Sequence, residues 1–314
     1  GATESNNIVL QGLKEYAEKT GKKHIITTSI EHKSILETAK YMELNGYEVD
    51  FIDPNKSGQI SIEEVLEKLR EDTLLVSIMH VNNETGVIQP VLELGEEIQK
   101  RGILFHIDAT QSCGKLVEEI RNLKYDMLSF SAHKLMGPQG VGALILKRKL
   151  YKRPPVKGIM YGGQQEQGIR PGTIPVALVV GCGKACEIAE HEYKENERHS
   201  LQIKEAILFV LEESGLKYQI NGNQDVCVSS TLNIAIDGVS SEALMISSKQ
   251  YCGISNGSAC TSSNYAPSYV LIAMGLDVSR IESSLRLSWG ATSNLNEIVD
   301  NFKNLLDVAK MMVN

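Results

Sequence analysis

The sequence predicts an α/β protein with a mostly parallel sheet in a large domain and a smaller α+β domain at the C-terminal side. Strand-like and helix-like segments alternate through the first half, which indicates βαβ units. Residues 73–81 form a near-continuous apolar run, typical of a parallel strand covered on both faces. From residue 176 to about residue 213 the pattern becomes helical, and a different arrangement follows.

The first half contains six short segments with strand composition. They comprise residues 24–30, 47–53, 73–81, 103–109, 126–132 and 141–147. Helical patterns separate the first four of them, at residues 31–46, 61–72 and 91–102. Gly46 ends the first helix, Ser61 and Glu64 form a capping box at the start of the second, and Pro90 precedes the third.

The second half has its own pattern. A long connecting helix is expected up to residue 213, followed by strand-like residues 227–236 and 284–290 and an amphipathic terminal helix at 296–312. We therefore expect a large domain over residues 1–190 and a small domain over residues 191–314.

Composition excludes several classes of protein. The chain has 314 residues and a formal charge of −7, which argues against a nucleic-acid-binding surface. No apolar run reaches the ~20 residues that span a bilayer, so no membrane partner is expected. The start, GATES, resembles neither a signal peptide nor a transit peptide and lacks an initiator Met. We expect it to begin within a longer parent chain.

Cysteine usage singles out one thiol. The six cysteines do not make a disulfide framework or a zinc-ligand pattern, and five lie in or beside apolar segments where a buried thiol is expected. This favours a reducing compartment, the cytoplasm, with a mitochondrion or another organelle left open. Cys260 differs, because it lies in SNGSACTSSNYAPS (255–268), a run of small polar residues that builds neither a helix face nor a strand face.

Polar side chains gather where expected strands end. They are Asn82, Asn83, Asp108, Gln111, Ser131, His133 and Lys134. Ligands of such sheets bind outside the carboxyl ends of the strands. Taken singly, each of these residues could instead cap a helix or lie in an exposed loop, and His32 could lie on the surface of a helix. Together with Ala2 and Thr3 at an expected helix start, they supply a phosphate cradle, a carboxylate, a histidine and a lysine. A pyridoxal phosphate site needs these groups: a Schiff-base lysine and a carboxylate that keeps the pyridine nitrogen protonated.

Eight motifs then occur in one family's order: GATESNN, IEHKS, VSIMHVNNETGV, FHIDATQSCGK, SFSAHKLMGPQGVG, GIRPGT, SNGSACTSS and SSLRLSWG. By these motifs the sequence resembles, nearly end to end, the cysteine desulfurases of the NifS/IscS type. These are fold-type I pyridoxal-phosphate-dependent transferases, similar to class V aminotransferases. The resemblance also implies that a further segment of the family, which helps to build the small domain, precedes GATES.

The resemblance implies a role for each candidate residue. Ala2 and Thr3 would hold the cofactor phosphate with Ser131 and His133, and Thr173 would reach the phosphate of the other subunit of a homodimer. His32 would stack on the pyridine ring and assist proton transfers. Asp108 would pair with the ring nitrogen, Gln111 with the phenolic oxygen, and Lys134 would carry the cofactor. Asn83 and Arg286 would fix the substrate carboxylate, a task that suits the guanidinium fork.

The implied reaction converts L-cysteine to L-alanine, with Cys260 leaving as a persulfide for a sulfur acceptor. The loop around Cys260 resembles the family branch with a longer loop, which passes sulfur to iron–sulfur scaffold or sulfur-carrier proteins; tRNA or DNA thiolation also draws on such enzymes. Two alternatives remain open. One is a catalytically impaired chain that only binds the sulfur acceptor. The other is a selenocysteine lyase or aminotransferase on the same fold.

Overall fold

A computed structural model describes residues 1–257 and 267–313 of the chain. Its described residues divide into two compact units. Unit 1 comprises Gly1–Asp53, Ile60–Val81 and Gln89–Tyr193, and unit 2 comprises Pro54–Gln59, Asn82–Ile88 and Lys194–Asn314. Cys260, the expected sulfur-accepting thiol, lies outside the described residues.

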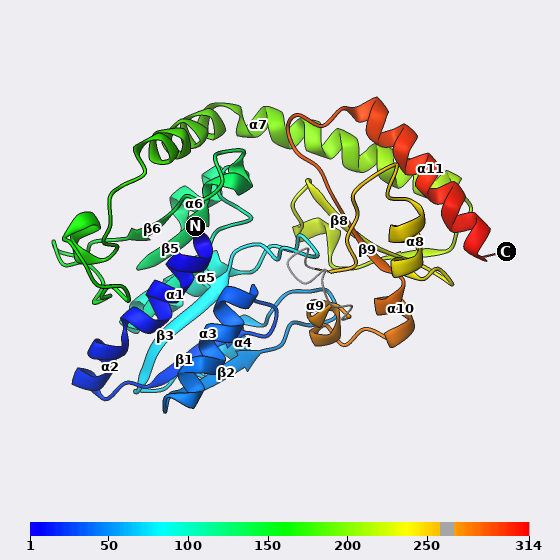
Figure 1. Ribbon diagram of the computed structural model, residues 1–314. Coiled ribbons are helices and arrows are strands. Elements are labelled where there is room, and N and C mark those ends of the chain that lie inside the picture. The colour runs from blue at the N-terminus through cyan, green and yellow to red at the C-terminus, as the bar shows by residue number, and fades with distance from the viewer. Residues whose placement is uncertain (258–266, 314) are drawn as a thin grey trace. The chain divides into compact units, whose positions relative to one another are not determined.

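Unit 1 is built on a six-stranded sheet with the order β2-β1-β3-β4-β5-β6 (Figure 1). Its strands are β1 (His24–Thr28), β2 (Glu48–Ile52), β3 (Thr73–Met79), β4 (Leu104–Asp108), β5 (Met127–Ser131) and β6 (Gly142–Leu146). All neighbouring strands are parallel except β6, which pairs with β5 in the antiparallel sense. The predicted mostly parallel sheet is therefore confirmed, and each strand begins and ends within two residues of its predicted bounds.

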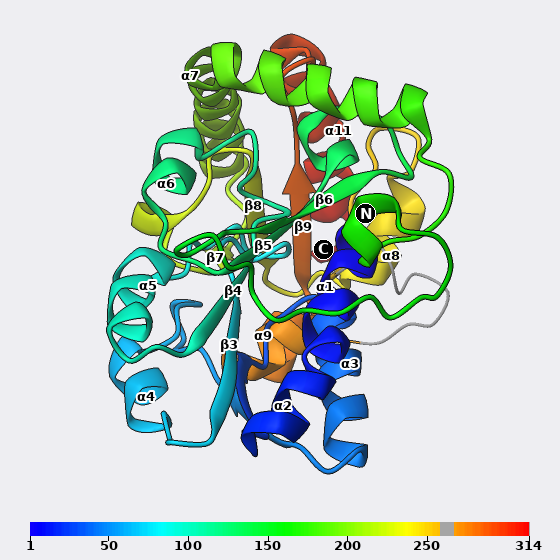
Figure 2. The ribbon, with the colours of Figure 1, turned by 90° about the vertical axis from the view of Figure 1, so that its left-hand side faces the viewer.

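Helices cover both faces of this sheet. They are α1 (Ala2–Gly12), α2 (Lys14–Thr20), α3 (Lys33–Leu44), α4 (Ile62–Glu67), α5 (Val91–Lys100) and α6 (Val117–Asn122). Figure 2 shows α1, α2 and α3 on one side of the sheet and α4, α5 and α6 on the other. The long helix α7 (Val176–Glu213) belongs to unit 1 up to Tyr193 and to unit 2 from Lys194.

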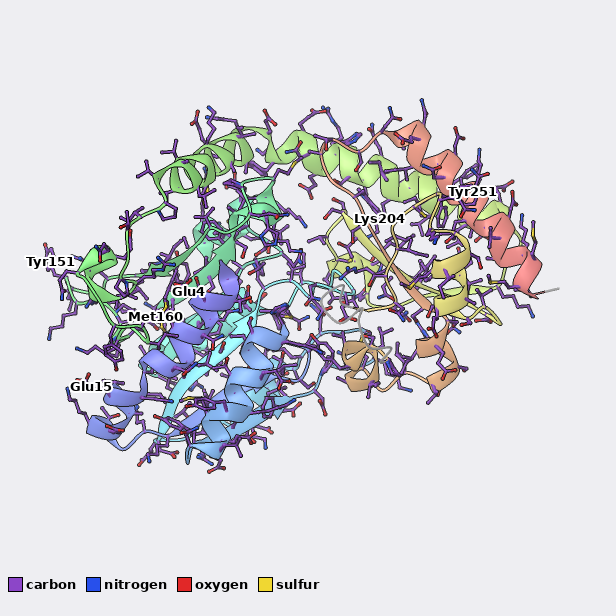
Figure 3. All side chains as sticks on the ribbon, viewed as in Figure 1. Glu4, Glu15, Tyr151, Met160, Lys204 and Tyr251 are labelled. Atoms are coloured by element: carbon purple, nitrogen blue, oxygen red, sulfur yellow. The ribbon has the colours of Figure 1, made fainter. Side chains whose placement is uncertain are left out.

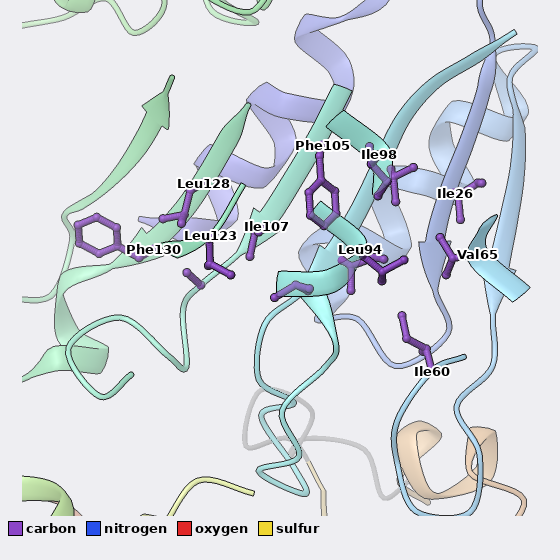
Figure 4. Close-up of a cluster of buried hydrophobic side chains, with 14 of the residues drawn as sticks. Ile26, Ile60, Val65, Leu94, Ile98, Phe105, Ile107, Leu123, Leu128 and Phe130 are labelled. Carbon is purple, nitrogen blue, oxygen red and sulfur yellow. The ribbon is translucent and has the colours of Figure 1, made fainter. Parts of the chain in front are cut away.

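The strands of unit 1 are apolar because both faces are covered. Every residue of β1, β3 and β5 is buried. Leu94 and Ile98 of α5 belong to the same buried cluster as Phe105 and Ile107 of β4 (Figure 4). Burying each such side chain contributes roughly 1.5–3 kcal/mol, so the sheet is a rigid frame for the groups at its carboxyl ends.

Helix α4 ends earlier than predicted. Ser61 caps it as expected, since the Ser61 side chain accepts a hydrogen bond from the Glu64 amide at 3.2 Å. The helix stops at Glu67, however, and not at residue 72. The Arg70 amide donates instead to the Thr73 side chain at 2.8 Å. This amide therefore needs no helical partner, and the chain continues into β3.

Unit 2 contains a three-stranded antiparallel sheet with the order β7-β8-β9. The strands are β7 (Tyr218–Ile220), β8 (Thr231–Ile236) and β9 (Ser284–Ser288), and the helices after α7 are α8 (Ser241–Ser247), α9 (Tyr269–Ala273), α10 (Val278–Glu282) and α11 (Leu295–Val313). Ile234, Leu285 and Leu305 are buried in one cluster. This is the predicted α+β arrangement.

The five described cysteines are free thiols, but only Cys182 is fully buried. The other four are half-buried, so the expectation of five buried thiols was wrong for them. Burial still raises the pKa of these four half-buried thiols, that of Cys113 to about 12, because a thiolate loses hydration there. Within residues 1–257 and 267–313, no helix has the length and apolar character required to cross a membrane.

Candidate active site

The strand order of unit 1 reverses once. From β1 the chain goes first to β2 on one side and then to β3 on the other, so the order reverses between β1 and β3. Ligands of open α/β sheets bind at the carboxyl ends of strands at such a point. Glu31 and His32 follow β1, and Asp108 is the last residue of β4, in register with Met79 of β3. The sheet topology therefore brings these side chains to one edge.

Asp108 is held in place as a hydrogen-bond acceptor. It is 5% exposed, and its Oδ2 accepts from the Asn6 side-chain amide at 2.7 Å. Its Oδ1 accepts from the Thr110 amide at 2.9 Å and from the Thr110 hydroxyl. A carboxylate has about four acceptor positions, so these three bonds leave one for a further donor.

His32 is fixed by the start of helix α3. It is the N-cap residue, and its Nδ1 accepts from the Ser34 amide at 3.1 Å and contacts the Ser34 hydroxyl at 2.8 Å. Burial lowers the pKa of His32, because the imidazolium loses hydration. The Asp108 charge opposes this effect, and the Lys134 charge adds to it. Both charges therefore act on the His32 ring.

The N-terminus of α1 lies against the end of β5 and the start of β6. The Ala2 amide donates to the Ser131 hydroxyl at 2.7 Å. A Cβ atom on Gly142 would lie 2.8 Å from the Gly1 Cα, so the close approach requires glycine there. Thr3 is exposed on the first turn. A helix N-terminus with a nearby hydroxyl is suited to bind an anion such as a phosphate.

Lys134 and His133 lie on the short helix η1 (Ala132–Leu135) directly after β5, and both are exposed. The Lys134 charge lowers the pKa of His133 in addition to the effect of burial. Burial lowers the pKa of Lys115 to about 8, and the Lys134 charge adds to this effect. The Lys134 ammonium is thus within electrostatic reach of His32, His133 and Lys115.

Two further predicted residues of unit 1 have no hydrogen bond among the described residues. Gln111 is half-buried in the turn that follows β4, three residues after Asp108. Thr173 is exposed in an irregular segment before α7. Their roles stay predictions.

The predicted substrate residues belong to unit 2. Arg286 lies on β9, and its Nη1 donates to the Asn83 backbone carbonyl at 3.0 Å. The Asn83 Oδ1 is buried and has no hydrogen-bond partner among the described residues. The two residues proposed for one carboxylate are therefore in direct contact within this unit.

Three residues of this edge were missed by the sequence analysis. Asn6 and Ser34 link Asp108 to His32, and Glu31 is fully buried, where its Oε1 accepts from the Met79 amide at 2.8 Å and from the Thr28 hydroxyl at 2.9 Å. Burial raises the pKa of Glu31 to about 8. The quoted motifs GATESNN and IEHKS contain all three residues, but nothing in their spacing indicates these contacts.

A cavity of about 590 Å³ lies elsewhere on unit 1, beside β6 and α1. Arg148, Arg153 and Arg170 are among its lining residues, together with Glu4, which accepts from Arg170 Nε at 2.9 Å (Glu4 is labelled in Figure 3). None of the predicted site residues lines it, so it is distinct from the edge that carries Asp108 and His32. Across residues 1–257 and 267–313, no group of three or more His, Cys, Asp or Glu side chains is arranged to hold a metal ion.

The sheet carries a carboxylate, a histidine and a lysine at its carboxyl edge, and a pyridoxal phosphate site uses a Schiff-base lysine and an acidic partner of the pyridine nitrogen. The aminotransferase class-V model matches residues 1–302. Cysteine desulfurase IscS of Vibrio vulnificus strain YJ016 is 42% identical over 298 residues, which are 95% of this chain and 72% of that protein.

Two solved structures agree with this result. DndA from Streptomyces lividans is 43% identical, with a TM-score of 0.83, and the match covers 92% of this chain and 81% of DndA. SspA, whose structure is a complex with cysteine, is 34% identical, with a TM-score of 0.78, and the match covers 94% of this chain and 81% of SspA. The chain belongs to the aminotransferase class-V family and, within it, to the cysteine desulfurases.

Proposed function

We propose that the protein binds pyridoxal 5′-phosphate at the carboxyl edge of the unit 1 sheet and converts L-cysteine to L-alanine. The observation that carries the proposal is Asp108. Its carboxylate is buried, is oriented by three hydrogen bonds, and keeps one acceptor position for a donor such as a protonated pyridine nitrogen. Membership of a pyridoxal-phosphate-dependent family supports the same cofactor.

The residues present fit this cofactor chemically. Ala2, Thr3, Ser131 and His133 would hold the phosphate at the start of α1, where backbone N–H groups and the helix dipole favour an anion. The Gly1–Gly142 approach supports this, because a side chain at either position would fill the space beside Ser131. Gln111 would donate to the phenolic oxygen, and Lys134 would hold the cofactor covalently.

The cofactor, when bound, withdraws electrons from the substrate α-carbon and makes its proton and the Cβ–S bond labile. This chain's residues then have defined tasks. His32, whose lowered pKa keeps the ring neutral near pH 7, would stack on the pyridine and assist proton transfers. Lys134 would move protons at the α-carbon. Asp108 would accept a hydrogen bond from the pyridine nitrogen.

We propose that Asn83 and Arg286 bind the substrate carboxylate. The guanidinium offers N–H donors in a fork that matches a carboxylate, and its contact with the Asn83 carbonyl orients it. The likeness to SspA, whose structure holds cysteine, supports L-cysteine as the substrate.

Cys260 would receive the sulfur. The thiolate attacks the substrate sulfur, the Cβ–S bond breaks, and Cβ gains a proton. The products are L-alanine and the Cys260 persulfide, so the Cys260 thiol and L-cysteine account for every atom. An iron–sulfur scaffold or a sulfur-carrier protein would then take the outer sulfur, and tRNA or DNA thiolation is a further use.

A homodimer is proposed as the working form. Several large apolar side chains of unit 1 are strongly exposed around the segment that contains Thr173: Tyr151 is 94% exposed, Tyr161 96% and Val176 66%. A subunit interface would cover these apolar side chains. Thr173 would then contact the phosphate bound by the partner subunit. Light scattering of the purified chain measures the mass directly, and a monomer would contradict this part.

We further propose that residues 1–190 form the cofactor-binding domain and residues 191–314 the small domain that carries Cys260. All proposed cofactor residues precede residue 190, and Arg286 and Cys260 follow it. The free thiols of the described cysteines support a reducing compartment such as the cytoplasm.

The function is tested with the purified chain, pyridoxal 5′-phosphate, L-cysteine and a dithiol that releases persulfide sulfur as sulfide. We expect alanine and sulfide in equal amounts. Cys260→Ser should retain the cofactor absorbance and lose sulfide release, whereas Lys134→Ala should lose the lysine-bound absorbance.

Cys252→Ser is the matched control, because Cys252 is a half-buried thiol of unit 2 with no proposed role. It should release sulfide like the unchanged chain. Cofactor binding without alanine formation would favour a chain that only binds the sulfur acceptor. Sulfide release by Cys260→Ser at the original rate would refute the persulfide step. The desulfurase relatives do not favour the selenocysteine lyase or aminotransferase alternative.

A further inference from the structure

A continuous chain of hydrogen bonds joins the two side chains proposed to contact the cofactor ring. His32 Nδ1 lies 2.8 Å from the Ser34 hydroxyl, which lies 2.9 Å from the Asn6 side-chain nitrogen, which lies 2.7 Å from Asp108 Oδ2. Asn6 is 0% exposed and Ser34 7% exposed. The connection is therefore shielded from solvent.

The direction of each bond follows from the chemistry of the groups. A carboxylate only accepts, so the Asn6 amide nitrogen faces Asp108 and donates to it. The second hydrogen of the same nitrogen goes to the Ser34 hydroxyl oxygen, which accepts. The Ser34 hydroxyl then has one proton left to donate, and among the described residues its only other partner is His32 Nδ1.

A second, independent donor reaches the same ring nitrogen. The Ser34 backbone N–H donates to His32 Nδ1 at 3.1 Å, and a backbone N–H cannot reverse its direction. Nδ1 is therefore an acceptor in both contacts, and the neutral imidazole carries its proton on Nε2. Among the described residues, Nε2 has no hydrogen-bond partner of its own.

We propose that Asn6 and Ser34 are positioning residues of the desulfurase reaction: they hold His32 as the neutral Nε2–H tautomer and connect it to the Asp108 carboxylate. This inference rests on the proposed function of His32 and Asp108. The fixed tautomer presents a proton donor at Nε2 and gives the ring a fixed plane for stacking. The bond from Asn6 also fixes the orientation of the Asp108 carboxylate, which would pair with the cofactor nitrogen, so one network orients both side chains.

The other charges that face His32 act in both directions. Asp108 of β4 favours the imidazolium, and Lys134 of η1 and Lys33 of α3 disfavour it. These charges change the extent of protonation, but they do not select between Nδ1 and Nε2 in the neutral ring. The two hydrogen bonds from Ser34 make that selection.

The test is the long-range ¹H–¹⁵N correlation spectrum of the chain labelled with ¹⁵N-histidine, recorded with and without pyridoxal 5′-phosphate. The His32 signals are assigned by their loss in His32→Gln. We expect an unprotonated Nδ1 and a protonated Nε2 in the chain without cofactor. A proton on Nδ1 in the neutral ring would overturn the inference, whatever the variants do.

Ser34→Ala removes the hydroxyl and keeps the backbone N–H. We expect the protonation equilibrium of His32 to move about threefold to tenfold toward the imidazolium, the factor that corresponds to one lost hydrogen bond. Thr38→Val is the matched control: it removes a hydroxyl one turn further along α3, which bonds the Ser34 carbonyl and Asn7 but not His32.

An unchanged His32 equilibrium in Ser34→Ala, or an equal change in Thr38→Val, would refute a positioning role for the Ser34 hydroxyl. These readouts need neither bound cofactor nor turnover. A failed desulfurase assay would therefore contradict the proposed function and leave the tautomer result standing. A failed tautomer result would remove this inference and leave the desulfurase assay to decide the function.

Discussion

Replacing Glu31 by glutamine removes a carboxyl group that the fold keeps protonated. Glu31 is 0% exposed, and burial raises its pKa from 4.5 to about 8, with a smaller contribution from the Asp108 charge. The hydrogen bonds from the Met79 amide and the Thr28 hydroxyl act in the opposite direction but are outweighed. Glutamine keeps the size of the side chain and an oxygen that can accept both bonds.

The sign of the effect on stability follows from proton binding. Below pH 4.5 both the folded and the unfolded chain hold the Glu31 proton. Between pH 4.5 and about 8 the unfolded chain releases it while the folded chain keeps it, so the free energy of unfolding falls as pH rises. The full pKa shift of Glu31 corresponds to a loss of about 5 kcal/mol in the free energy of unfolding, at about 1.4 kcal/mol per pKa unit. The amide introduced by Glu31→Gln has no proton to release in this range, so this loss disappears in the variant.

Urea unfolding followed by circular dichroism measures the effect at several values between pH 4.5 and 8. We expect Glu31→Gln to gain stability relative to the unchanged chain as pH rises, by a few kcal/mol over this range. Glu37→Gln, which removes an exposed carboxylate of α3, is the control for a general change in charge. A stability difference between Glu31→Gln and the unchanged chain that does not vary with pH would refute the reasoning, because it would mean that Glu31 ionises equally in both states.

Two further predictions concern the frame of unit 1. Ser61→Ala removes the side chain that accepts from the Glu64 amide at the start of α4, and it should lower the free energy of unfolding by about 1 kcal/mol; urea unfolding with no loss would show that the cap contributes nothing. Gly142→Ala would place a Cβ 2.3 Å from the Phe130 carbonyl oxygen and 2.8 Å from the Gly1 Cα. It should destabilise the protein by about 1–3 kcal/mol and weaken the binding of pyridoxal 5′-phosphate, measured by thermal melting and by cofactor titration. Gly183→Ala, whose Cβ would meet nothing within 4 Å, is its control, and equal melting temperatures for the two variants would contradict the steric argument.

The proposed chemistry depends on two side chains of unit 1, Asp108 and His32, which differ in their hydrogen bonding. Asp108 is presented as an acceptor, because all its described partners donate to it. His32 is presented as a neutral ring, because burial and two donors at Nδ1 oppose its protonation. The Asn6–Ser34 link joins these two side chains through hydrogen bonds.

The local pattern of the chain was sufficient to predict the strands and most helices of unit 1. Apolar runs such as residues 73–81 form strands because a two-sided sheet buries them on both faces, and β3 follows this rule over Thr73–Met79. The end of α4 was not predictable in the same way. Residues 68–72 have a helical composition, but the Arg70 amide finds a tertiary partner in Thr73, and Arg70 also pairs with Glu48 of β2.

The candidate residues at the strand ends could be predicted from the sequence, because polar groups after apolar strands meet at one edge of a parallel sheet. The resemblance to the cysteine desulfurases came from eight motifs in that family's order. The contacts of Asn6 and Glu31 could not be predicted in either way. Asn6 donates to Asp108, 102 residues away, and Glu31 bonds the Met79 amide, 48 residues away. The local sequence around Glu31 does not tell whether its side chain is buried and protonated or exposed near the start of a helix. Only the packing of the folded chain removes water from these side chains, and the loss of water is what raises the pKa of Glu31.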